Sequence, residues 1–321
     1  MASVSEISRN EGVPLDLDLI KGIKVNRSAV ERRAATLGTR RTVKKEWQAA
    51  WLLKAITCID LTTLAGDDTP GNVTRLCAKA MQPVRKDLLE ALGMSGIPIH
   101  VGAVCVYHNL IAAAAEALGS SGIPIAAVST GFPAGQITME QKLREIEASV
   151  KAGATEIDIV ISRANVLRAN WEALYEEVVL FRKTCEHAHM KVILATGELS
   201  TLTNVAKASY VSMMAGADFI KTSTGKESVN ATLPVSLVMT RAIREYQEQT
   251  GFKVGFKPAG GIRKAKQALE WLILMKEELG PEWLNPHLFR FGASELLGDI
   301  ERQLEHFITG RYSASYRHPM S

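Results

Sequence analysis

Short apolar runs alternate with longer amphipathic segments along the chain from residue 51 onward. Most of these runs are apolar throughout, with Gly, Asp or Thr at their ends, and such runs are typical of strands buried on both faces of a parallel sheet. Eight runs predict strands, at residues 55–60, 100–107, 124–130, 156–162, 191–196, 218–223, 253–257 and 288–292.

The segments between these runs have the period of amphipathic helices. Segment 138–152 opens with a capping box formed by Thr138 and Gln141 and is followed by Gly153, a residue that favours a helix end. Similar segments predict helices at residues 170–187, 201–215, 234–249, 264–279 and 294–309.

Eight strands that alternate with helices predict an α/β fold, a (β/α)8 TIM barrel. An open doubly wound sheet is the alternative, and it is disfavoured because no GxGxxG follows the first strand. We expect residues 1–46 to form an N-terminal helical extension, with helix-like stretches at 15–23 and 26–35. Residues 47–310 would form the barrel domain and residues 311–321 a C-terminal tail.

Composition narrows the class of protein. Of the 321 residues 46% are hydrophobic, which is enough for a large core and excludes global disorder. No apolar run approaches the ~18 residues of a membrane span, and the first residues lack the pattern of a secretory signal. The four cysteines form no CxxC pair and no cluster with histidine, so neither disulfides nor a metal site are expected. We therefore expect a cytoplasmic protein, with a nuclear pool left open.

Charge says little about partners. The 38 Lys+Arg and 34 Asp+Glu residues give a net charge of +4, and the basic excess is local. A basic cluster of this kind can bind nucleic acid or a phosphorylated protein. No aromatic residues that could stack on bases lie among these cations, so nucleic acid is disfavoured and a solvated helix face is the simpler interpretation. A protein partner stays open for this segment, whose cations are Arg32, Arg33, Arg40, Arg41, Lys44 and Lys45.

Four charged residues stand inside or at the end of apolar strands, where burial of a charge is costly. Asp60 ends the first run, Asp158 lies in the fourth, Lys221 in the sixth and Lys257 in the seventh. A lone lysine of this kind is more often an edge residue, and a lone aspartate more often a structural hydrogen-bond acceptor. In a barrel, however, the carboxyl ends of the strands meet at one mouth, where active sites lie.

Two lysines and two carboxylates at one mouth suit Schiff-base chemistry on a carbonyl substrate. Lysine has an ordinary pKa near ~10.4 and is a poor nucleophile when protonated. Desolvation and a second cation both lower that pKa, and the neutral amine attacks carbonyl groups. A neighbouring carboxylate such as Asp158 can move protons directly or through water.

Glycines and hydroxyl residues follow the last three strands, at residues 222–226, 259–263 and 292–294. Small residues let backbone N–H groups approach an anion, and the helix N-termini that follow add favourable partial charge. Barrels often hold phosphate near the loops after strands seven and eight. The alternative is that these glycines only make tight turns. Because three such loops occur together with two lysines, the loops predict a phosphate site.

Six ordered motifs resemble the 2-deoxyribose-5-phosphate aldolases, a family of class I aldolases, over roughly residues 47–307. The long N-terminal extension is similar to the animal form. The motifs are Asp60-Leu-Thr-Thr-Leu64, Glu156-Ile-Asp-Ile-Val160, Thr196-Gly-Glu-Leu199, Phe219-Ile-Lys-Thr-Ser-Thr-Gly-Lys226, Gly255-Phe-Lys-Pro-Ala-Gly-Gly-Ile-Arg263 and Arg290-Phe-Gly-Ala-Ser294.

The resemblance implies a role for each matching residue. Lys221 stands at the Schiff-base position, Lys257 at that of the lysine that lowers its pKa, and Asp158 at that of the carboxylate that relays protons through water. Other matching positions line the substrate: Asp60 and Thr62 near its hydroxyls, Cys105 near the pocket, and Thr224, Gly225, Lys226, Gly260, Gly261, Arg263, Gly292 and Ser294 around its phosphate.

The chain departs from the family pattern at three places. Tyr107-His108 stands where Tyr-Pro is frequent, and Glu295 where bacterial members have a small hydroxyl residue, so Glu295 is not a predicted ligand. In some members a C-terminal tyrosine reaches the site, but neither Tyr312 nor Tyr316 can be aligned with it.

The implied function is a lyase that reversibly cleaves 2-deoxy-D-ribose 5-phosphate to acetaldehyde and D-glyceraldehyde 3-phosphate, in deoxynucleoside catabolism. It implies no metal and no cofactor, and the sequence leaves open whether the chain forms a homo-oligomer. Two alternatives remain: a phosphate-binding barrel of other chemistry, such as an isomerase, and a non-catalytic protein that binds partners through its basic segment.

Overall fold

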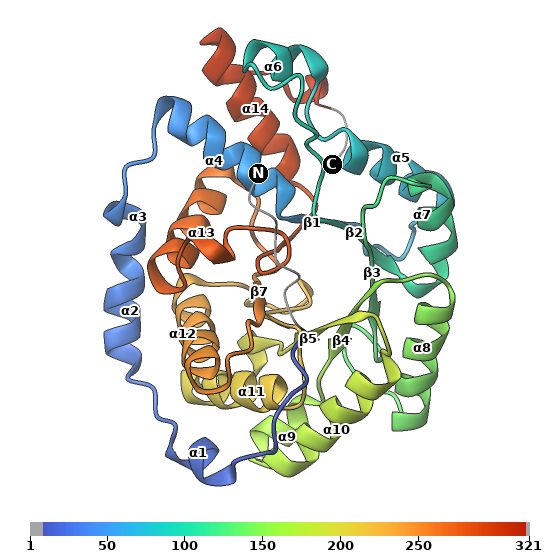
Figure 1. Cartoon of the computed structure of the whole chain (residues 1–321), viewed down its shortest axis with the longest axis vertical. Helices are drawn as coiled ribbons and strands as arrows, with labels where there is room; N and C mark the ends of the chain where they lie inside the picture. The colour runs from blue at the N-terminus through green and yellow to red at the C-terminus, as the bar shows by residue number, and fades with distance from the viewer. Residues whose placement is uncertain (1–8, 319–321) are drawn as a thin grey trace.

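The computed structural model describes residues 9–318 and contains one eight-stranded parallel sheet. The strand order is β7-β6-β5-β4-β3-β2-β1-β8, and every ladder between neighbours is parallel. The predicted barrel is confirmed (Figure 1). Its strands are β1 (Ile59–Thr62), β2 (Ala103–Tyr107), β3 (Ile125–Ser129), β4 (Glu156–Val160), β5 (His189–Ile193), β6 (Phe219–Lys221), β7 (Gly255–Lys257) and β8 (Phe291–Ala293).

The last strand meets β7 through two isolated parallel bridges, which nearly close the barrel. Phe256 pairs with Phe289 and Ala259 with Gly292. A Cβ at Gly292 would lie 2.7 Å from the Cβ of Ala259, so only glycine fits this close approach of two chain segments.

Helices follow the strands and cover the outside of the barrel. The capping box of Thr138 and Gln141 is present at the start of α8, as the sequence predicts. The helices that cover the sheet are α5 (Pro70–Met81), α6 (Lys86–Ala91), α7 (Ile111–Leu118), α8 (Met139–Lys151), α9 (Arg163–Leu167), α10 (Trp171–Thr184), α11 (Leu202–Met214), α12 (Leu233–Thr250), α13 (Ala265–Glu278) and α14 (Leu296–Thr309); short 3-10 turns are η1 (His108–Leu110), η2 (Thr196–Glu198), η3 (Pro281–Trp283) and η4 (Ser315–Arg317).

The predicted start of the first strand is wrong. Residues 55–57 belong to α4 (Lys45–Thr57), and β1 begins at Ile59. The apolar run is continuous because the buried face of the helix, with Leu52 and Ile56, leads directly into the buried strand. Hydrophobicity alone does not separate two buried elements that are joined without a polar loop.

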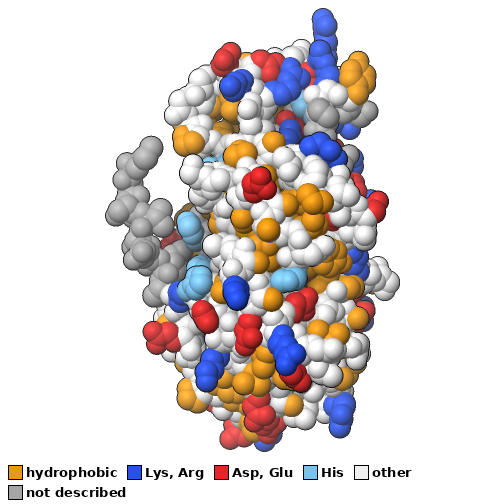
Figure 2. Space-filling model, turned by 90° about the vertical axis from the view of Figure 1, so that its right-hand side faces the viewer, with side chains coloured by type: hydrophobic (Ala, Val, Ile, Leu, Met, Phe, Trp, Pro, Cys, Tyr) orange, Lys and Arg blue, Asp and Glu red, His pale blue; other side chains and the backbone are white. Residues whose placement is uncertain are grey.

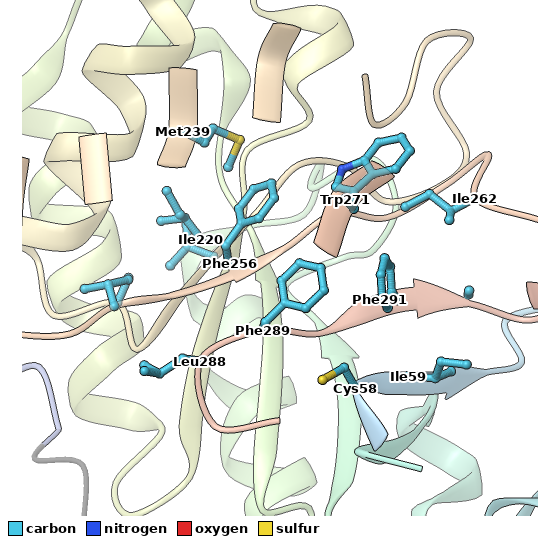
Figure 3. Close-up of a cluster of buried hydrophobic side chains, with 14 of the residues drawn as sticks. Cys58, Ile59, Ile220, Met239, Phe256, Ile262, Trp271, Leu288, Phe289 and Phe291 are labelled. Carbon is cyan, nitrogen blue, oxygen red and sulfur yellow. The ribbon is translucent and has the colours of Figure 1, made fainter. Parts of the chain in front are cut away.

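Aromatic packing fills the space between the sheet and the helices near the closure (Figure 3). The rings of Phe289 and Phe291 meet edge to face at a centroid distance of 4.7 Å, and Phe256 stacks on Phe289 at 6.4 Å. The indole of Trp271 donates a hydrogen bond to Ser236 Oγ at 3.1 Å. This packing stabilises the part of the barrel where the ladder is shortest.

The N-terminal segment lies along the outside of the barrel, beside α12 and α13 (Figure 1). It contains α1 (Leu17–Gly22), α2 (Arg27–Ala35) and α3 (Leu37–Arg40), and then leads into α4. Its buried side chains include Ile20 and Leu37. Arg33 and Arg41 of the basic cluster form ion pairs with Glu278 (2.9 Å) and Glu277 (2.7 Å) of α13. Part of the basic cluster therefore fastens the extension to the barrel.

Among the described residues, one face of the molecule shows no large area of a single charge (Figure 2). On the face that Figure 2 shows, acidic and basic side chains alternate with apolar ones. Among residues 9–318, no helix is both long enough and apolar enough to span a membrane.

Candidate active site

A cavity of about 310 Å³ opens at the carboxyl ends of the strands. It includes most of the residues that the sequence analysis selects, and Lys221 from β6 lies at its floor. Its predicted lining residues are Thr62, Lys221, Thr224, Gly225, Lys226, Gly260, Gly261, Arg263, Gly292 and Ser294.

A buried group of charged side chains lies beneath this cavity, inside the barrel. Each member is at most 5% exposed, so each pairing replaces lost hydration. We call this group the charge cluster; it consists of Asp60, Glu156, Asp158, Lys191, Lys221, Lys257 and Arg290.

Asp158 is the centre of the charge cluster. Its Oδ2 accepts hydrogen bonds from Nζ of Lys221 and Nζ of Lys257, each at 2.7 Å, and its Oδ1 lies 3.2 Å from Nζ of Lys191. Lys257 also lies 2.5 Å from Asp60 Oδ2. The structure therefore brings the four predicted charged residues together.

The sequence analysis missed three members of the charge cluster. Arg290 contacts Asp60 at 2.5 Å and Glu156 at 2.8 Å, and Lys191 forms a very short ion pair with Glu156. One signal was available: Glu156 and Asp158 are two apart on β4, so their side chains share a face of the sheet. Lys191 on β5 lies in register with Asp158 on β4. To predict this contact, one must know that these two strands are neighbours.

The electrostatics separate Lys221 from the other cations. Burial lowers the pKa of Lys221, and nearby Lys257 lowers it further, against the opposing effect of Asp158. Burial also disfavours the charge of Lys257, but Asp158 and Asp60 together hold its pKa above the ordinary value. Asp158 has a pKa well below the usual range despite its burial, because three lysines surround it. The cluster thus favours a neutral amine on Lys221 next to an ionised carboxylate.

The loop after β6 is held by a residue that the sequence analysis did not select. The carboxylate of Glu227 accepts hydrogen bonds from the backbone N–H of Thr224 at 3.0 Å and that of Gly225 at 3.1 Å. It also accepts one from the hydroxyl of Thr224 at 2.7 Å. These two amides are therefore already bonded within the loop, which fixes its shape against the cavity.

The loop after β7 differs from the loop after β6, because two of its backbone amides are not bonded within the loop. Gly260 and Gly261 have φ values of +81° and +80°, which favour glycine. Their backbone N–H groups have no acceptor within the described residues. They lie on the cavity wall, ahead of the N-terminus of α13, where partial positive charge favours an anion.

The comparisons with known proteins agree with this geometry. The sequence model of the DeoC/LacD family aldolases matches residues 54–276. A human protein named deoxyribose-phosphate aldolase is 61% identical over 316 residues, which cover 98% of this chain and 99% of the human one. The chain belongs to the DeoC/LacD family of aldolases. The family resemblance found in the sequence is confirmed, and the isomerase and non-catalytic alternatives are not.

Further relatives of this aldolase show how far the similarity extends. A mouse protein, also named deoxyribose-phosphate aldolase, is 62% identical over 312 residues, covering 97% of this chain and 98% of its own. The deoxyribose phosphate aldolase from Aeropyrum pernix, described as tetrameric, has a TM-score of 0.57 at 24% identity, over 87% of this chain and 99% of its own. A structure from Toxoplasma gondii has a TM-score of 0.70 at 23% identity, over 83% and 98%. At such identities the two structures support the fold alone.

Cys105, which the resemblance placed near the pocket, and the two C-terminal tyrosines, which it left unassigned, lie outside the cavity lining. Cys105 is fully buried, and burial raises the pKa of its thiol, which disfavours the reactive thiolate. Tyr312 and Tyr316 are 86% and 83% exposed, and Tyr312 stacks on His306 at 4.7 Å. Neither tyrosine belongs to the cavity lining in this conformation.

The rim of the cavity carries an ion pair. Glu295 precedes α14 without capping it through its side chain; its carboxylate instead lies 3.6 Å from Nε of Arg263. Both side chains are at least half exposed to solvent, 66% for Arg263 and 50% for Glu295.

Proposed function

We propose that this aldolase reversibly cleaves 2-deoxy-D-ribose 5-phosphate to acetaldehyde and D-glyceraldehyde 3-phosphate through an imine on Lys221. The observation that carries the proposal is the Lys221 amine: it lies at the cavity floor, its pKa is lowered, and a carboxylate lies 2.7 Å away. The names of the human and mouse relatives support the substrate.

The first step is imine formation. The neutral amine of Lys221 attacks C1 of the open-chain aldehyde, and a proton moves from nitrogen to oxygen to give a carbinolamine. Loss of water then leaves a protonated imine. Asp158 is ionised and lies beside both lysines, so it can accept and return these protons through a water in the cavity, with Lys257 as the adjacent acid.

The second step is cleavage. Acetaldehyde retains two carbons, so the bond between C2 and C3 must break. As the C3 hydroxyl loses its proton, the electron pair of that bond moves toward the protonated imine and forms an enamine, while C3 leaves as the aldehyde of glyceraldehyde 3-phosphate. Protonation of the enamine at C2 and addition of water release acetaldehyde and restore the Lys221 amine.

The cavity lining supports one orientation of the substrate. The free amides of Gly260 and Gly261, together with Ser294 and Lys226, would hold the phosphate. Thr62 would face the sugar hydroxyls. Asp60 lies below the cavity, where it binds Lys257. This orientation places C1 toward Lys221 at the floor of the cavity. The same activity would place the enzyme in the breakdown of deoxynucleosides.

Removal of the rim carboxylate tests where the phosphate lies. In the Glu295→Gln variant we expect KM for deoxyribose 5-phosphate to fall about two- to fivefold, because a negative charge leaves the rim and Arg263 is released from an exposed ion pair. Steady-state kinetics with unphosphorylated deoxyribose is the control, since its KM should not change. Equal effects on both substrates would place the phosphate away from Gly260 and Gly261.

The reaction itself is tested by reductive trapping. The protein is incubated with deoxyribose 5-phosphate or acetaldehyde, borohydride is added, and the modified peptide is mapped by mass spectrometry. The expected adduct lies on Lys221. An adduct on Lys257 would keep the reaction class and exchange the roles of the two lysines, whereas no adduct on a folded protein would reject the imine mechanism.

A further inference from the structure

Six members of the charge cluster form a closed ring of alternating charge. Lys257 lies 2.7 Å from Asp158 and 2.5 Å from Asp60. Arg290 continues the ring from Asp60 at 2.5 Å to Glu156 at 2.8 Å.

Lys191 completes the ring from β5. It pairs with Glu156 Oε2 and with Asp158 Oδ1, the latter at 3.2 Å. Lys257 and Arg290 thus each contact two of the three carboxylates, and Lys191 also lies 3.8 Å from Asp60 Oδ2, the third carboxylate. Three positive and three negative charges balance within the ring.

Lys221 lies outside this balance. Its Nζ lies 2.7 Å from Oδ2 of Asp158, the same oxygen that Lys257 contacts at 2.7 Å. A charged Lys221 would give the buried cluster four cations for three carboxylates. An uncompensated charge in a buried site is costly, and a lysine avoids that cost by losing its proton.

We propose that Lys191 is a positioning residue that closes the ring and so leaves Lys221 as the excess amine of the cluster, neutral and ready to attack. This inference rests on the proposed function, in which Lys221 forms the imine. Lys191 is fully buried below the cavity and is not part of its lining, so it acts through Asp158 and Glu156 and not on the substrate.

The titratable side chains that surround Lys221 belong to the ring, to Cys105 or to the cavity rim. Near Lys221, β3 presents apolar residues such as Ala126 and Val128. The charged or titratable groups are Asp60 from β1, Cys105 from β2, Glu156 and Asp158 from β4, Lys191 from β5, Lys257 from β7, Arg290 before β8, and Lys226, Arg263 and Glu295 at the cavity rim.

The test is the pH dependence of kcat/KM for cleavage, measured between pH 5.5 and 10. Activity requires a neutral amine and falls as the pH drops below the pKa of Lys221. In Lys191→Met, three carboxylates face two cations of the ring, so Lys221 becomes the third cation and its pKa rises. We call the pH range in which kcat/KM falls with decreasing pH the acidic limb, and we expect it to move to higher pH by about one to two units. At neutral pH this shift lowers kcat/KM roughly 10- to 100-fold, and the difference disappears at alkaline pH.

A second pair of variants separates charge from structure. Glu156→Gln removes a carboxylate from the complete ring and should move the limb to lower pH, the opposite direction. The double variant Lys191→Met/Glu156→Gln leaves Asp60 and Asp158 with Lys257 and Arg290, so the limb should return toward its original position. Glu156→Gln also keeps the test decisive if Lys191→Met fails to fold.

Lys142→Met is the matched control. Lys142 is another buried lysine, 2.8 Å from Glu177, but it lies in α8 outside the barrel; its loss should lower stability and leave the limb in place. The proposal is overturned if the limb stays fixed in Lys191→Met and Glu156→Gln and the double variant shows only summed losses at every pH. Trapping on Lys221 in the unmodified protein decides the proposed function separately, so the two failures are distinguishable.

Discussion

Replacing Lys221 by methionine is expected to lower kcat for aldol cleavage by about four orders of magnitude or more, the scale seen when a covalent nucleophile is removed. Methionine has nearly the length of lysine and no amine, so no imine can form. The six remaining members of the charge cluster keep three carboxylates and three cations in contact. We therefore expect this variant to fold at least as stably as the unmodified protein, as measured by urea denaturation.

Lys221→Arg provides the complementary measurement. It also lacks a nucleophilic amine, so trapping with borohydride should be lost in both variants. Arginine adds a permanent fourth cation to the buried cluster, however, and should destabilise the fold where methionine does not. A Lys221→Met protein that still cleaves the sugar at more than one-hundredth of the original rate would contradict the imine at this position.

Most of the barrel could be predicted because its strands are buried on both faces. Continuous apolar runs such as those of β2 and β3 stand out from the amphipathic helices beside them. The same property caused the error at the first strand, where the buried face of α4 joins β1 without a polar break. Where two buried elements are adjacent, composition does not place the boundary between them.

The candidate site could be predicted only in part, because three of its charged residues do not interrupt an apolar run of the sequence. Lys221, Lys257, Asp158 and Asp60 were found because each interrupts or ends an apolar run of the sequence, although only the two lysines end their strands in the structure. Glu156 begins β4 and Arg290 directly precedes β8, where a charged residue usually marks a loop. Lys191 lies in the middle of β5, in register with Asp158, but it opens the apolar run predicted at 191–196. Their roles depend on which strands are neighbours, and the sequence pattern does not contain the strand order.

Local side-chain contacts also limited how well the phosphate loops could be predicted from the sequence. The glycines after β6 and β7 were predicted to cradle phosphate. In the structure Glu227 takes up the amides of Thr224 and Gly225, and the amides of Gly260 and Gly261 are left without a partner among the described residues. A carboxylate three residues after a threonine is also compatible with a surface loop, so the pattern alone does not tell the two loops apart.

Asp158→Asn is expected to lower both activity and stability. The carboxylate contacts three lysines, and its loss leaves the three cations of the ring, with the Lys221 amine beside them, facing two carboxylates. We expect kcat to fall about 10²- to 10⁴-fold, since proton transfer to and from the imine loses its carboxylate. Removal of one partner from a buried ion pair typically costs about 3–5 kcal/mol of unfolding free energy.

The pH dependence of that stability loss follows from the pKa of Asp158. Burial raises this pKa, but the lysines around it hold it well below the ordinary value of an aspartate, about 3.9. The carboxylate therefore stabilises the fold above that ordinary value, and its contribution is lost as the pH falls further. The difference in unfolding free energy between the two proteins should therefore be constant from pH 5 to 8 and shrink below about pH 4.

Glu177→Gln is the matched control for Asp158→Asn, because Glu177 is a buried carboxylate that binds Lys142 and Ser162 away from the cavity. It should cost a comparable amount of stability, measured by urea denaturation, and leave kcat unchanged. If Asp158→Asn loses stability but cleaves the sugar as fast as Glu177→Gln does, Asp158 only balances charge and another group moves the protons. If it loses activity without losing stability, Asp158 is needed for the chemistry and the closed ring contributes little to the fold.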